Sequence, residues 1–88
     1  MKRYIKSSHN PYPTITYEVI GWKSSNSENA ELHKSDFTSY GDAEKFARSK
    51  WDYYRIDLNK ITQYDDEMPT SVRLTQFKNG HESARSFV

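Results

Sequence analysis

The chain has 88 residues, no cysteine and a formal net charge of +1. This length allows one domain, residues 1–88. The lack of cysteine excludes disulfides, thiolate catalysis and cysteine-ligated metal sites, and the near-neutral charge gives no general attraction to nucleic acid.

The sequence predicts neither a signal peptide nor a membrane-spanning segment. Lys2 and Arg3 are followed by polar residues at 7–10, where a signal peptide needs an apolar core. No apolar run approaches the roughly 20 residues that span a bilayer. We therefore expect a cytoplasmic protein.

The first elements are an extended arm and a strand. Residues 1–13 form a basic arm or an edge strand, since Pro11 and Pro13 exclude a helix. Residues 14–23 are rich in β-branched side chains and predict a strand. Its first face carries Ile15, Tyr17 and Val19, and Ile20 and Trp22 share its second face.

A hairpin and the only clear helix follow. The polar stretch 24–29 predicts a loop, and 30–37 predicts a second strand with His33 and Phe37 on the face opposite Leu32. From Ser39 to Trp51, apolar residues recur every three to four positions, and Ser39 with Asp42 resembles a capping box, which predicts a helix.

Two more strands complete the fold. Residues 52–64 alternate, with a bulge or bend near Asn59, and 70–78 predict a strand with Val72 and Leu74 inward. Asn79-Gly80 is a turn signal, and 81–88 is expected to be a loose tail. The fold class is therefore α+β: a four-stranded antiparallel sheet with one helix packed on a face, in the order ββαββ.

Catalysis is not expected. The three histidines are far apart in sequence, and His33 is better explained as an ordinary strand residue than as a general base. The acidic run 65–67 lacks the ligand spacing of a calcium loop and fits a solvated turn. We predict that the chain is not an enzyme and that it has no metal and no cofactor.

Two binding functions remain. A surplus of aromatic residues on the second sheet face predicts a surface for a larger protein partner, formed by Trp22, Phe37, Tyr53 and Arg55. The alternative is nucleic acid, bound by an aromatic and basic patch of Arg3, Lys6, Lys50, Tyr53 and Arg55. The oligomeric state does not follow from the sequence.

Two segments resemble known small proteins. These segments are similar to segments in accessory proteins of phages and mobile elements, anti-CRISPR inhibitors among them. They are the opening Met-Lys-Arg-Tyr-Ile-Lys-Ser-Ser and Phe-Thr-Ser-Tyr-Gly-Asp-Ala-Glu-Lys-Phe-Ala at 37–47. This resemblance implies a protein that binds host machinery stoichiometrically without catalysis, and it carries over no particular residue.

One arrangement would separate the two hypotheses. If Trp51, Tyr53, Tyr54 and Arg55 share an exposed face with the basic arm, nucleic acid is favoured. If Trp22 and Phe37 form an open patch, a protein partner is favoured.

Overall fold

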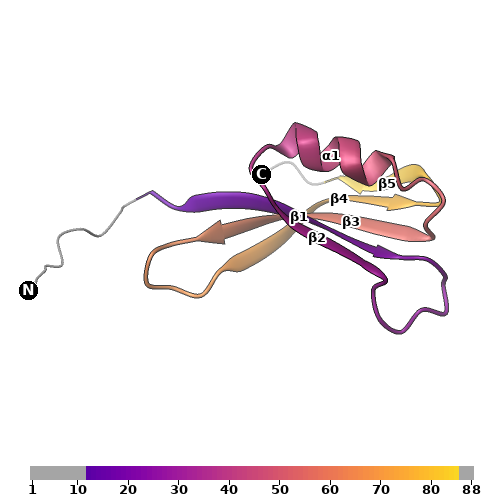
Figure 1. Cartoon of the computed structure of the whole chain (residues 1–88), viewed down its shortest axis with the longest axis horizontal. Coiled ribbons are helices and arrows are strands. Elements are labelled where there is room, and N and C mark those ends of the chain that lie inside the picture. The colour runs from indigo at the N-terminus through magenta and orange to yellow at the C-terminus, as the bar shows by residue number, and fades with distance from the viewer. Residues whose placement is uncertain (1–11, 86–88) are drawn as a thin grey trace, which may run out of the picture.

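The described part of the chain is an α+β fold with one helix on an antiparallel sheet, as predicted (Figure 1). The computed structural model describes residues 12–85. Its strands lie in the order β2-β1-β3-β4-β5. The elements are β1 (Thr14–Trp22), β2 (Leu32–Phe37), α1 (Tyr40–Arg48), β3 (Arg55–Gln63), β4 (Thr70–Lys78) and β5 (His81–Arg85).

The core lies between α1 and one face of the sheet, here called the helix face. Strands β1 and β3 pair without irregularity from Thr14 opposite Gln63 to Trp22 opposite Arg55. The buried core consists of Val19, Ile56, Leu58, Leu74 and Phe77 from the sheet, with Ala43 and Ala47 from the helix. Small alanines let the helix backbone lie close to the strands. The first part of β1, the last part of β3 and the first part of β4 extend beyond the helix (Figure 1).

The helix begins where the sequence predicts and ends earlier. The Ser39 hydroxyl accepts a hydrogen bond from the Asp42 amide at 3.4 Å, and this satisfies one of the unpaired amides of the first turn. The last helical residue is Arg48. Trp51, predicted as the final residue of the helix, lies in the following loop with 69% of its surface exposed.

The sheet has a fifth strand in place of part of the expected tail. Asn79 and Gly80 have φ angles of 50° and 83°, the left-handed pair that a two-residue hairpin requires. Lys78 therefore lies opposite His81, and residues 81–85 pair with β4. Because this segment is short and mostly polar, it has no alternation of apolar and polar residues that would have predicted a strand. Residues 1–11 of the predicted arm and residues 86–88 lie outside the described residues.

A bulge in the first hairpin corrects the predicted face of Phe37. Phe37 lies opposite Tyr17 and Lys34 lies opposite Val19, so β2 has one extra residue between these pairs. Asp36, within the bulge, has a φ of 71°. The bulge moves Phe37 to the helix face, whereas His33, opposite Ile20, stays on the other face.

A second bulge explains a phase error in the prediction for β4. Leu58 lies opposite Thr75 and Asn59 opposite Arg73, so Leu74 is the extra residue. The irregularity lies near Asn59 as predicted, but it belongs to the neighbouring strand. Leu74 is buried as expected, while Thr75 also reaches the interior and Val72 is 47% exposed.

Candidate interaction surface on the open sheet face

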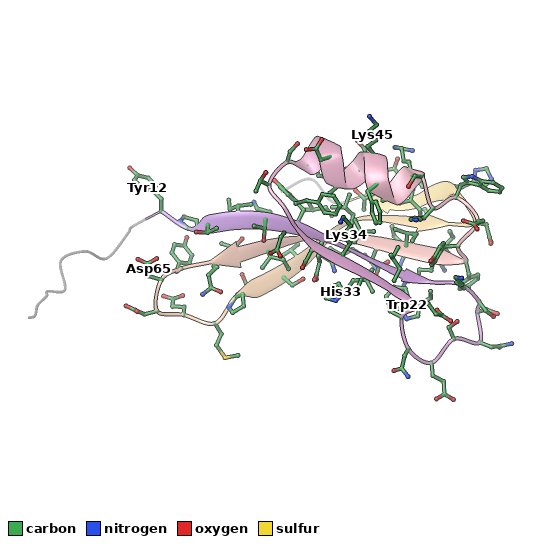
Figure 2. The ribbon with its side chains drawn as sticks, viewed as in Figure 1. Tyr12, Trp22, His33, Lys34, Lys45 and Asp65 are labelled. Carbon is green, nitrogen blue, oxygen red and sulfur yellow. The ribbon has the colours of Figure 1, made fainter. Side chains whose placement is uncertain are left out.

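The face of the sheet opposite α1, here called the open face, carries an ordered set of polar and aromatic side chains. Within residues 12–85, the single helix lies on the other side (Figure 1). Trp22 and His33 lie on the side of the sheet away from the helix (Figure 2). Cross-strand register assigns these residues to the same face: Glu18, Ile20, Trp22, His33, Arg55, Asp57, Asn59, Arg73 and Gln76.

Arg55 and Trp22 form the aromatic part of this surface. They are directly opposite each other on β3 and β1. The Arg55 guanidinium carbon lies 4.7 Å from the centroid of the Trp22 ring, within the range of a cation–π contact. Both residues are half-buried. The pair therefore presents a large ring and a charged group in a defined arrangement.

Asp57 holds Arg55 in position from the next residue on the same face. Arg55 donates from Nε to Oδ1 at 3.1 Å and from a terminal nitrogen to Oδ2 at 2.8 Å. These bonds, acting against partial burial, raise the pKa of Arg55 above its ordinary value. Gln76 donates to Asp57 Oδ1 at 3.1 Å, and Ser83 donates to Gln76 Oε1 at 3.2 Å. The contacts link β3, β4 and β5.

A second network joins β1, β2 and β3. Glu18 accepts a hydrogen bond from Asn59 Nδ2 at 3.0 Å, and its other oxygen lies 2.9 Å from His33 Nε2. The Glu18 side chain is only 15% exposed, whereas that of His33 is 59% exposed. The carboxylates of Glu18 and Asp57 on the open face are thus largely buried. Their oxygens already contact neighbouring side chains.

The four residues predicted for a protein partner divide between the two faces. Trp22 and Arg55 are in contact on the open face. Phe37 packs on the helix face, with its ring centroid 5.6 Å from that of Phe46. Tyr53 is also on the helix face, beside Gly21, and packs against the core. Trp22 and Phe37 do not form one patch.

The residues predicted for nucleic acid are also dispersed. Lys50 lies over the Phe46 ring on the helix face, and Arg55 is on the open face. Trp51 is exposed near the β4–β5 turn, and Tyr54 is half-buried and accepts a backbone hydrogen bond from Asn79. Arg3 and Lys6 lie outside the described residues.

The sequence reasoning missed the polar residues that hold the open face together. Asp57 follows Arg55 by two positions on a strand, a spacing that places both on one face and that could have predicted the pair. Gln76 and Asn59 could not be found in this way, because their partners come from other strands and depend on the register. The bulge at Leu74 sets part of that register.

Comparisons with protein-family models, curated proteins and solved structures give no match for this chain. In residues 12–85 there is no helix long and apolar enough to cross a membrane. The same residues contain no group of three or more histidine, aspartate or glutamate side chains arranged to hold a metal ion.

Proposed function

We propose that this chain is a non-catalytic binding protein that acts stoichiometrically on a larger protein partner through its open face. The partner we propose is a host defence nuclease such as a CRISPR effector. The chain would be a phage or mobile-element protein that inhibits this nuclease by covering a surface that the nuclease needs for activity. The observation that carries the binding proposal is the Trp22–Arg55 pair held by Asp57 on the open face.

Tryptophan and arginine are among the residue types that most often dominate binding energy at protein interfaces. Here both are half-buried and fixed by contacts, so binding would cost less side-chain entropy than for two free chains. Ile20 adds apolar area beside them, because it lies between Trp22 and Glu18 along the same face of β1. A central aromatic group with polar neighbours matches the usual anatomy of an interface.

The described side chains support binding better than catalysis. Glu18 occupies His33 Nε2 at 2.9 Å, and both Asp57 oxygens accept hydrogen bonds. A general base needs a reacting group within hydrogen-bond reach. No serine or threonine hydroxyl bonds to His33 among the contacts of residues 12–85, so this pair has the properties of a structural contact.

The open face is less suited to nucleic acid. A phosphate strand crossing it would meet the carboxylates of Glu18 and Asp57 near the middle of the sheet. The guanidinium of Arg55 already covers part of the Trp22 ring, which reduces the area for base stacking. Tyr53, which was expected to stack beside Arg55, packs on the opposite face.

The proposal can be tested with a panel of purified CRISPR effector complexes. Target-DNA cleavage is measured while the chain is titrated against each effector, and complex formation is followed by size-exclusion chromatography. We expect cleavage by a susceptible effector to stop at a fixed molar ratio. The Trp22→Ala variant should lose this inhibition, and Trp51→Ala, which removes an exposed tryptophan elsewhere, should retain it.

Circular dichroism of both variants provides the folding control. If no effector in the panel is bound or inhibited, the proposed partner class is wrong. If an effector is inhibited equally well by the wild type and by folded Trp22→Ala, the partner does not use the open face.

A further inference from the structure

Two lysines lie over a pair of phenylalanine rings at the junction of α1 and β2. Lys34 Nζ is 5.7 Å from the ring centroid of Phe37 and 5.8 Å from that of Phe46. Lys50 Nζ is 5.1 Å from the centroid of Phe46. These four residues, here called the lysine–phenylalanine cluster, lie on the helix face and are separate from the open face.

The two lysines of this cluster, Lys34 and Lys50, form no ion pair with another described residue. Arg48 on the same helix is different, because it lies 3.0 Å from a Glu44 oxygen and 3.6 Å from a Glu82 oxygen. A ring attracts an ammonium group through its quadrupole but does not neutralise it. An anionic partner can therefore contact either lysine without breaking an ion pair within residues 12–85.

A third lysine continues the row along the same side of the sheet. Lys23 Nζ lies 5.8 Å from the centroid of the Tyr53 ring, which packs on the helix face. Lys34 is opposite Val19, and Lys23, the residue that directly follows β1, is four positions after Val19. At about 3.3 Å per residue, this separation is about 13 Å along the strand. Lys23 also attracts Glu31, so its charge is in part compensated.

We propose that the row Lys34, Lys50 and Lys23 binds the sugar–phosphate backbone of a nucleic acid strand. Along a duplex, each strand carries one negative charge for about every 3.4 Å of helix axis, so in that stacked form about four nucleotides span the distance from Lys34 to Lys23. The regularly repeated phosphates of a strand can contact all three lysines of the row, whereas a single acidic side chain would contact only one. Because ammonium groups lie over the rings, the contact is made to phosphates and not by base stacking. It is therefore independent of sequence.

This inference concerns a different surface from the proposed protein interface and does not depend on it. Binding of a fluorescent 12-nucleotide DNA or RNA strand to the full chain is measured by anisotropy between 50 and 200 mM salt. Variants are Lys34→Gln, Lys50→Gln and their combination. The matched control is Lys78→Gln, which removes an exposed lysine from the open face. Glutamine keeps most of the apolar stem, and circular dichroism checks folding.

With three phosphate contacts, the affinity of the wild type should fall roughly twentyfold between 50 and 200 mM salt. The double variant should bind more weakly and show a fall of only roughly threefold, because one contact remains. Lys78→Gln should match the wild type. No binding at 50 mM salt, or binding that the double variant retains, overturns the proposal. Stronger binding of a polyglutamate peptide than of the oligonucleotide also overturns it and indicates an acidic protein surface instead.

Discussion

Replacing Asp57 with asparagine tests whether the open face is held in a fixed arrangement before any partner arrives. The Asp57 side chain is 10% exposed and accepts two hydrogen bonds from Arg55 and one from Gln76. Asparagine has the same shape, but its NH₂ group cannot accept from a guanidinium. At least one Arg55 hydrogen bond is lost, and the remaining bonds lose their ionic character.

The expected cost follows from these contacts. A hydrogen bond to a charged group contributes about 1.5–3 kcal/mol to the free energy of unfolding. Because the Arg55 side chain is 37% exposed, water replaces part of the lost interaction. We therefore expect Asp57→Asn to lower the free energy of unfolding by about 1.5 kcal/mol, at the lower end of this range.

The assay is urea unfolding followed by tryptophan fluorescence and by circular dichroism, so that two-state behaviour is checked. Asp57→Asn, Arg55→Gln and the double variant form a cycle, whose expected coupling energy is about 1 kcal/mol. Glu28→Gln changes an exposed loop carboxylate and should alter stability by less than about 0.5 kcal/mol. A coupling below about 0.3 kcal/mol would refute the reasoning, because water would then replace Asp57 without loss.

Three further predictions concern the core, the last turn and the first loop. Leu58→Ala, at a position with 0% exposure, should lower the free energy of unfolding in urea by about 2–5 kcal/mol. Gly80→Ala should cost about 1–2 kcal/mol in thermal unfolding, since φ is +83° and the new Cβ would lie 3.1 Å from the Trp51 carbonyl. A stability equal to the wild type would contradict either prediction. Hydrogen bonds from the Lys23 amide and from the Ser27 hydroxyl lower the pKa of Glu31 below its ordinary value of 4.5. The stabilisation from these bonds is therefore complete above pH 4.5 and is lost as the pH falls through the lowered pKa. The Lys23 amide resonance should follow this change in an NMR titration, and a midpoint at or above 4.5 would contradict the assignment.

The two proposed surfaces lie on opposite sides of the sheet. The open face presents Trp22 and Arg55 above carboxylates that are already occupied, which suits a protein partner. The lysine–phenylalanine cluster presents ammonium groups that form no ion pair within residues 12–85, which suits phosphates. A partner that is itself a complex of protein and nucleic acid would offer both chemistries. The cleavage assay and the anisotropy assay test the two surfaces separately.

Much of the fold follows from local patterns. The β-branched alternation at 14–23 and at 70–78 predicts two strands close to their observed bounds, because successive side chains of a strand point to opposite faces of the sheet. Ser39 predicts the start of α1 because its hydroxyl satisfies a first-turn amide. Asn79 and Gly80 predict a turn because both tolerate positive φ.

The composition of each surface was decided by tertiary structure. Phe37 joins the core because one extra residue in β2 reverses the alternation after Lys34, and a bulge of this kind leaves no mark on hydrophobic periodicity. Leu74 shifts β4 in the same way. The contacts of Asp57 with Gln76 and of Lys34 with Phe46 join residues from different elements. Local sequence therefore determined which segments become strands and helix, and the strand register with its two bulges decided which side chains meet on each face.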